Sequence, residues 1–265
     1  MDKLLEELHS FPEREKNLRA ITRYSLYKTM WYRSNLWSHS RRVAWITEEI
    51  VPIASEVLGS SFDPQKAIAI ALVHDDAEIL FGDIQAGNKA KMSQDELNDI
   101  KKLEKDAVQQ LSLTYPQNLG TYNYKSLLLE AAEKSSLEAM IVNWADKYDA
   151  FGEALHEIYS GNTLWTKNVE NKYGKISLPT EYYINYFNSF EKQFPSIAPL
   201  LLQKNSWLSI PDDPRIENIL TLSKEHTLTS LHEKKGYIPY DQWVDITLRY
   251  GTEEDISNLY IKKEN

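Results

Sequence analysis

Residues 67–83 read AIAIALVHDDAEILFGD, and this stretch decides the fold that we expect. Its first seven residues are all apolar. They follow Asp63 and Pro64, which suit the N-cap and the first position of a helix. We therefore predict a helix from Pro64 that is buried on every side, with a pattern that ends at Gly82. Residues 74–76 (HDD) end the apolar run, so polar groups are expected next to the core.

Helical periodicity continues along almost the whole chain, whereas Gly and Pro are scarce, at 9 and 10 residues. Two helix starts carry the pattern of a capping box, Ser93 with Glu96 and Ser135 with Glu138. We expect an all-α fold built as a helical bundle. The further helices that we predict cover residues 38–58, 93–113, 135–160 and 181–194.

The amino-acid composition of the sequence changes near residue 161. Residues 162–215 are rich in Asn, Tyr, Trp and Pro, yet no flexible linker separates them from the preceding helix. We predict a core over residues 1–161 and a mostly helical C-terminal extension over residues 162–265 that packs on this core.

The composition restricts the classes of function. The chain has 265 residues, with 30 Lys and Arg against 39 Asp and Glu, and a net charge of -9. This balance argues against a nucleic-acid-coating protein, although a locally positive site can still bind a small anion. Cysteine is absent, so thiolate chemistry is excluded and any metal must be held by nitrogen and oxygen.

No run of residues approaches the roughly 18–20 apolar residues that span a bilayer. The first residues, MDKLLEELHSFPEREKN, mix charges into an apolar pattern and lack the apolar region of a signal peptide. We expect a cytoplasmic protein that binds no membrane.

A mixed set of imidazoles and carboxylates stands out at His39, His74, Asp75 and Asp146. Such ligands suit a divalent metal such as Mn, Fe, Co, Ni or Zn. Each residue also has a structural interpretation: His39 extends an apolar stripe, the doublet could mark the point where a helix reaches the surface, and Asp146 lies opposite its helix's apolar stripe. The combination favours a metal site.

Three segments carry a resemblance to a known family. SHS (38–40), ALVHDDAEILFGDI (71–84) and NWADKYDA (143–150) resemble the HD-domain metal-dependent phosphohydrolases, and within them the 5'-deoxynucleotidase branch. The pattern H-D-x-x-E-x-x-x-G-D of that branch is matched over residues 74–83. The resemblance covers about residues 20–160. It implies an HD-domain helical bundle and one divalent ion (Mn, Co, Fe, Ni, Zn or Mg), with four ligands: His39, His74, Asp75 and Asp146.

The same resemblance implies roles for further residues. Glu78 would act as general base or proton shuttle for a water activated by the metal. Asp83 would serve the substrate end of the site, and Arg23 would contact the substrate phosphate. Tyr24 stands where the family often has a Trp near the sugar. Lys89 and Lys147 are further candidate cations.

These features favour a metal-dependent phosphohydrolase that releases phosphate from nucleoside 5'-monophosphates, with deoxyribonucleotides expected as substrates. Two alternatives stay open: an HD phosphohydrolase of a larger nucleotide, such as a triphosphate or a guanosine alarmone, and a non-catalytic nucleotide-binding HD scaffold. We expect a small-molecule nucleotide as partner, no nucleic acid, and a homodimer.

Overall fold

The structure, a computed structural model, describes residues 1–24, 30–84, 89, 92–159, 169–171, 174–176, 179–197 and 240–259. Within these residues the chain forms helices and two antiparallel pairs of very short strands, so the predicted all-α class is confirmed. The chain forms two compact units. One comprises residues 1–25 and 34–146, and the other comprises residues 26–33 and 147–265.

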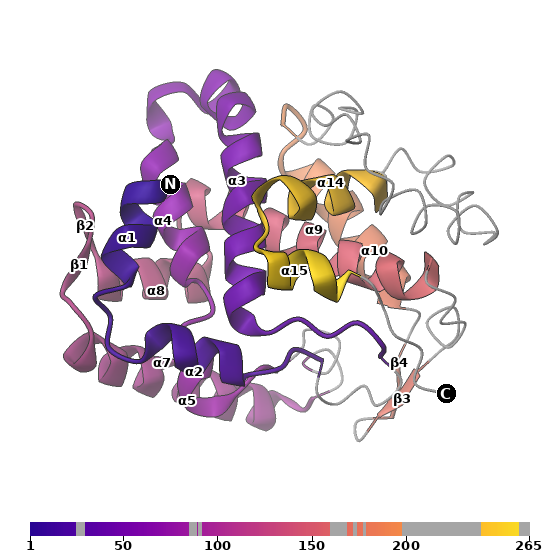
Figure 1. Cartoon of the computed structure of the whole chain (residues 1–265), viewed down its shortest axis with the longest axis horizontal. Coiled ribbons are helices and arrows are strands. Elements are labelled where there is room, and N and C mark those ends of the chain that lie inside the picture. Colours follow the sequence, from indigo (N-terminus) through magenta and orange to yellow (C-terminus); the bar gives the residue numbers. More distant parts are fainter. Residues whose placement is uncertain are drawn as a thin grey trace. The chain divides into compact units, whose positions relative to one another are not determined.

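The first unit runs from α1 to the start of α9 (Figure 1). Its elements are α1 (Asp2–Leu8), α2 (Arg14–Ala20), α3 (Leu36–Leu58), η1 (Gly59–Ser61), α4 (Pro64–Val73), α5 (Glu78–Phe81), α7 (Gln94–Thr114), β1 (Asn118–Leu119), β2 (Tyr122–Asn123), α8 (Tyr124–Glu133) and the first part of α9 (Leu137–Tyr159).

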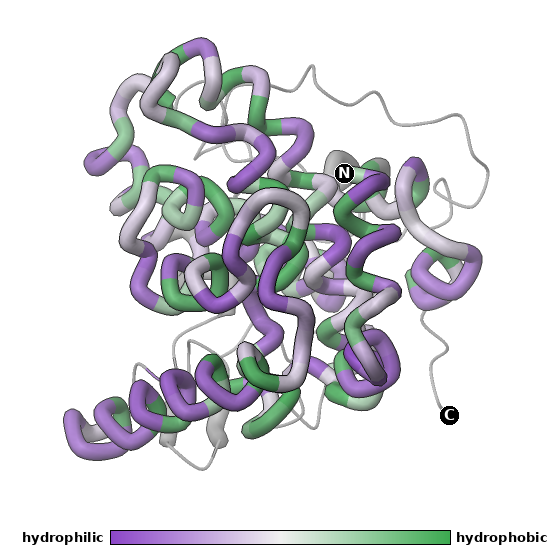
Figure 2. The backbone as a smooth tube through the Cα atoms, turned by 90° about the vertical axis from the view of Figure 1, so that its left-hand side faces the viewer, coloured by the Kyte–Doolittle hydropathy of each residue, from purple (hydrophilic) through white to green (hydrophobic). Residues whose placement is uncertain are grey.

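The centre of this unit is α3, which packs against α4, while α8 covers α4 and α7. Asn35 caps α3 because its side chain accepts the Ser38 N–H at 2.9 Å, so the helix begins two residues before its predicted start. Asp63 caps α4, and residues 67–73 are all buried, as predicted. In Figure 2 the helices alternate between hydrophilic and hydrophobic residues, the pattern of helices that share a core.

The prediction that the helix pattern continues to Gly82 is wrong in part. Helix α4 ends at Val73, residues 74–77 form turns, and α5 begins only at Glu78. The backbone tightens to three-residue steps, since Asp76 N–H bonds the Val73 carbonyl and Glu78 N–H bonds the Asp75 carbonyl. A tight turn therefore separates Glu78 from the doublet, and Glu78 does not share an α-helical face with it.

Of the two predicted capping boxes, one is confirmed and one is wrong. Ser93 and Glu96 cap α7 reciprocally, as expected. At α9 the Ser136 hydroxyl, and not that of Ser135, accepts the Ala139 N–H at 3.2 Å. Glu138 instead accepts the Asp63 N–H at 2.8 Å, so this carboxylate joins the starts of two helices. A local pattern could not reveal that distant partner.

The second unit contains the rest of α9, together with β3 (Val169–Asn171), β4 (Gly174–Ile176), α10 (Pro179–Gln193), α14 (Tyr240–Tyr250) and α15 (Glu253–Asn258). Trp243 of α14 packs directly over Gly152 of α9 and donates its indole N–H to Asp149 at 2.9 Å. Glu157, fully buried, accepts the backbone N–H groups of Trp31 and Tyr32.

The predicted domain boundary at residues 161/162 lies outside the described residues, so the division into 1–161 and 162–265 stays a prediction. Among the described helices none is long and apolar enough to cross a membrane. The cytoplasmic location also stays a prediction.

Candidate metal centre

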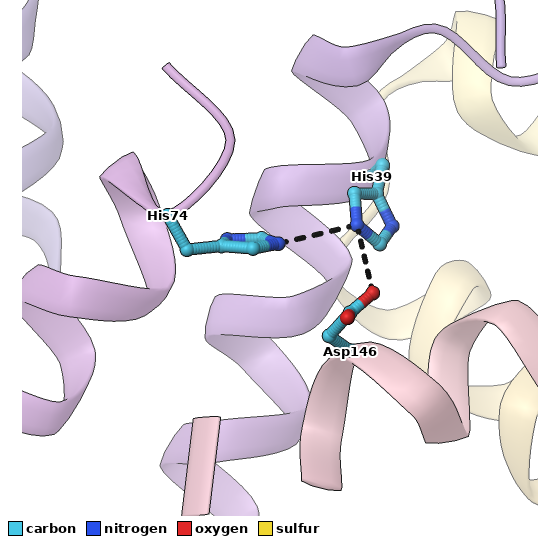
Figure 3. A group of neighbouring side chains, drawn as sticks. All are labelled: His39, His74 and Asp146. Carbon is cyan, nitrogen blue, oxygen red and sulfur yellow. Dashed lines mark hydrogen bonds and ion pairs between the residues drawn. The ribbon is translucent and has the colours of Figure 1, made fainter. Parts of the chain in front are cut away.

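Three of the predicted metal ligands meet in the first unit. His39 lies on α3, His74 directly follows α4, and Asp146 lies on α9, and their side chains point toward one another (Figure 3). The His39 Nε2 atom is 3.3 Å from His74 Nε2 and 3.3 Å from Asp146 Oδ1. His39 is fully buried, whereas the Asp146 side chain keeps 17% exposure, so the group opens toward solvent on the carboxylate side.

Asp75 completes the group of four. Its Oδ2 atom lies 3.2 Å from His39 Nε2 and 3.3 Å from His74 Nε2. Burial acts to raise the pKa of Asp75, but the charge of His74 and hydrogen bonds from both imidazoles outweigh it and hold this pKa well below its usual range. The carboxylate is therefore ionised and ready to bind a cation.

The donor set fits a divalent ion. Adjacent ligands of an ion with bonds of about 2.1 Å lie roughly 3 Å apart, close to the 3.2–3.3 Å separations here. His74 Nδ1 lies 2.8 Å from the Ala71 carbonyl and donates its proton there, so Nε2 is the ring nitrogen that faces the group and would bind an ion in place of its proton. Two imidazoles and two carboxylates match a borderline metal.

Glu78 lies beside this group, at the start of α5. Burial raises the pKa of Glu78 well above its ordinary value, and the charges of Asp75 and Asp83 raise it further, while Arg23 and Lys89 act against them. Its Oε2 atom is buried and has no hydrogen-bond partner among the described residues. A carboxyl group with a raised pKa is suited to accept and release a proton in catalysis.

Arg23, Tyr24 and Asp83 form one connected group. The Tyr24 N–H donates to Asp83 Oδ2 at 3.0 Å, and the Arg23 guanidinium lies 5.2 Å from the centre of the Tyr24 ring. Tyr24 has a φ of 54°, a left-handed conformation that is unusual for a bulky residue and is often found at functional sites. Arg23 is 7% exposed, so it is a core-facing residue and not a surface arginine.

The two lysines named as further cations differ in position. Lys89 donates to Glu104 of α7 at 2.9 Å, and its charge acts on Glu78. Lys147 directly follows Asp146 and belongs to the second unit. Neither observation identifies a phosphate-binding role for these lysines.

Asp76 is the residue whose importance the sequence did not reveal. It is fully buried and receives two hydrogen bonds from Arg14, at 2.7 and 2.6 Å, and one from the Tyr124 hydroxyl at 2.7 Å. The apolar run before it signals that a charge there needs a partner. That signal cannot identify Arg14, which lies 62 residues away.

Comparison with known proteins gives a consistent family. The family model described as "5'-deoxynucleotidase YfbR-like" matches residues 11–194, a longer span than the expected 20–160. A 5'-deoxynucleotidase of Vibrio vulnificus is 25% identical over 199 residues, which cover 73% of this chain and 100% of that protein. One from Pectobacterium atrosepticum is 29% identical over 149 residues, covering 56% and 73% of the two chains.

A solved structure shares the fold. An HD-domain phosphohydrolase from Listeria innocua superposes with a TM-score of 0.56 at 18% identity, covering 86% of this chain and 97% of that one. This likeness confirms the predicted HD-domain helical fold.

Proposed function

The chain belongs to the YfbR-like 5'-deoxynucleotidase family, and from this premise we propose which of its residues release phosphate from a nucleoside 5'-monophosphate. The family predicted from the motif of residues 74–83 is confirmed, and with it a hydrolase of phosphoric monoesters. The residue assignment depends on one observation: His74, Asp75 and Asp146 each place a donor atom 3.2–3.3 Å from His39 Nε2, and Glu78, whose Oε2 atom is buried, begins the helix that follows the His74–Asp75 turn.

His39, His74, Asp75 and Asp146 would hold a divalent ion in this assignment. When bound, the ion supplies Lewis-acid polarisation and lowers the pKa of a coordinated water. The orientation of His74, with Nδ1 on the Ala71 carbonyl and Nε2 facing the group, and the ionised state of Asp75 support the assignment. Mn, Co, Fe, Ni, Zn and Mg are the candidates that the donor set admits.

Glu78 is the residue that moves the proton. A water molecule adds to phosphorus, the bond between phosphorus and the 5'-oxygen breaks, and a proton of the water passes to the Glu78 carboxylate. The same proton can then reach the 5'-oxygen, which leaves as the nucleoside hydroxyl. The buried Oε2 atom without a hydrogen-bond partner among the described residues is available for this water.

Arg23 neutralises the phosphoryl oxygens in this proposal, because a guanidinium pairs with phosphate through two parallel hydrogen bonds. Asp83 positions Arg23 indirectly, because it accepts a hydrogen bond from the backbone N–H of the next residue, Tyr24. Tyr24 is proposed to lie beside the sugar, where the family often has a Trp. The deoxyribonucleotide preference named for the relatives is extended to this chain from the family match alone.

Phosphate release from dAMP, measured with Mn²⁺, Co²⁺ or Zn²⁺ supplied, tests the assignment. Asp75→Ala should lower the rate by at least about 100-fold, since a ligand and its charge are lost. The exposed Asp99 of α7 gives a matched control: Asp99→Ala should leave the rate unchanged. An Asp75→Ala protein with the wild-type rate would overturn the proposal.

A panel of deoxy- and ribonucleoside mono-, di- and triphosphates separates the alternatives. Monophosphates, and deoxy forms above all, should be the best substrates. Preferential hydrolysis of triphosphates or alarmones would move the substrate class to a larger nucleotide. Binding without hydrolysis under any metal would indicate a scaffold.

A further inference from the structure

A buried polar network lies directly behind the turn that carries two of the proposed metal ligands. We define the Asp76 network as Arg14, Asp76, Tyr124 and the Leu72 carbonyl. Arg14 binds both carboxylate oxygens of Asp76 and donates to the Leu72 carbonyl at 2.6 Å, and the Tyr124 hydroxyl donates to Asp76. The three side chains are 0–1% exposed.

The network joins three elements of the first unit. Arg14 begins α2, Tyr124 begins α8, and Asp76 lies on the turn after α4. Both carboxylate oxygens of Asp76 accept hydrogen bonds: Oδ1 accepts one from Arg14, and Oδ2 accepts one from Arg14 and one from Tyr124. Asp76 is therefore fixed from two sides by helices that do not belong to its own segment.

Stability does not explain such a network well. A buried ion pair repays its desolvation only partly, and apolar residues of similar volume often serve as well or better. The network does fix the position of the turn that carries Asp76. Asp76 directly follows Asp75 and lies two residues after His74, in a turn that has left the α-helical ladder at Val73.

We propose that the Asp76 network positions the His74–Asp75 turn against His39 so that the four ligand atoms converge, which makes Arg14, Asp76 and Tyr124 positioning residues of the metal site. This inference rests on the metal site of the proposed function. It concerns residues outside that site, since none of the three touches the ligand group through its side chain in the contacts described above.

The test replaces the network by apolar residues in the full chain, as Arg14→Met/Asp76→Leu/Tyr124→Phe. This triple variant leaves no buried charge unpaired, so its thermal stability should stay near that of the wild type. The readouts are the Co²⁺ dissociation constant and the Co²⁺ absorption bands, which report ligand number and geometry independently of catalysis. A matched control is Lys66→Met/Glu130→Leu, which removes a 2.7 Å ion pair between α4 and α8 that lies outside the network.

The proposal expects the triple variant to bind Co²⁺ about 10- to 100-fold more weakly, with shifted bands, while the control keeps the wild-type values. A folded triple variant with wild-type affinity and spectrum would overturn it. If the triple variant does not fold, Tyr124→Phe, which removes a single hydrogen bond, takes its place: weaker Co²⁺ binding supports the proposal and unchanged binding overturns it. A wild-type chain that binds no Co²⁺, Mn²⁺ or Zn²⁺ would instead refute the metal site itself.

Discussion

Tyr24 donates its backbone N–H to Asp83 Oδ2 at 3.0 Å, across 59 residues of sequence. The bond ties the end of the H-D-x-x-E-x-x-x-G-D motif to the residue after Arg23. Tyr24 also adopts a left-handed backbone with a φ of 54°. A conformation of this kind persists only where surrounding contacts enforce it, and Asp83 is one of those contacts.

Removing this contact should weaken substrate binding more than metal binding. Asp83→Ala frees the Tyr24 N–H and lets the Arg23–Tyr24 turn relax, so we expect KM for dAMP to rise about 5- to 100-fold, the equivalent of about 1–3 kcal/mol. Steady-state kinetics and a Co²⁺ titration measure the two effects separately. An unchanged KM, or a loss of Co²⁺ affinity as large as the loss in KM, would contradict the positioning role of Asp83.

The pH dependence of activity should respond to the charge of Asp83. Burial raises the pKa of Glu78 most, the charge of Asp75 comes next, and the charge of Asp83 adds to both. Glu78 must be ionised to accept a proton. Asp83→Asn keeps an oxygen acceptor for Tyr24 but removes the charge. The acid limb of the pH profile of kcat/KM should therefore move to lower pH, whether or not the maximal value of kcat/KM changes. A limb that stays in place would show that Glu78 does not titrate there.

Glu78→Gln should lower the catalytic rate and raise the stability of the fold. The folded-state pKa of Glu78 lies well above its ordinary value of 4.5, so the folded protein binds a proton that the unfolded chain releases. As pH rises above 4.5, the unfolding free energy of the wild type falls until pH passes the folded-state pKa. The metal-free Gln variant escapes this loss and should unfold at a higher temperature near pH 7.5, by about 2–4 °C for each kcal/mol.

Catalysis should fall by roughly 10²- to 10⁴-fold in the same variant, the usual contribution of a general base. Glu133, exposed near the end of α8, provides the control, since Glu133→Gln should change neither thermal midpoint nor rate. Scanning calorimetry of the metal-free proteins from pH 4 to 8 gives the comparison. Coincident stability curves for wild type and Glu78→Gln would rule out a raised pKa.

Metal binding should stabilise the fold through Asp146. Mn²⁺ at 100 times its dissociation constant should add about 2.7 kcal/mol to the unfolding free energy of the wild type. Asp146→Asn should lose most of this gain because its Oδ1 atom lies 3.3 Å from His39 Nε2, inside the ligand group. Asp106→Asn, on an exposed position of α7, should retain it. Equal stabilisation of both variants would place the ion elsewhere.

The contact of Trp243 with Gly152 should tolerate no added carbon. A Cβ at Gly152 would lie 2.0 Å from Trp243 Cδ1, so Gly152→Ala must displace α14 or the indole. We expect a loss of about 1–3 kcal/mol of stability from overpacking. The double variant Gly152→Ala/Trp243→Leu should cost less than the sum of its two single changes, because the smaller side chain leaves room. Additive losses in urea denaturation would argue against the contact.

Local sequence determined much of the fold and singled out the residues that are proposed as metal ligands. The N-cap Asp63, the buried run 67–73 and the Ser93–Glu96 capping box were all predictable, because a cap acts within three residues and burial follows helical spacing. The motif of residues 74–83 also indicated the family, which the match over residues 11–194 confirms. These signals depend on neighbours along the chain.

Tertiary structure alone decided which distant groups meet. The sequence showed that a charge at Asp76 follows an apolar run, but its partners Arg14 and Tyr124 lie 62 and 48 residues away. The same holds for Tyr24 with Asp83, and for Glu138, which bonds Asp63 in place of the expected cap. Burial requires each polar group to have a partner, but many sequence positions can meet that requirement equally well. Packing of the helices selects the one that does.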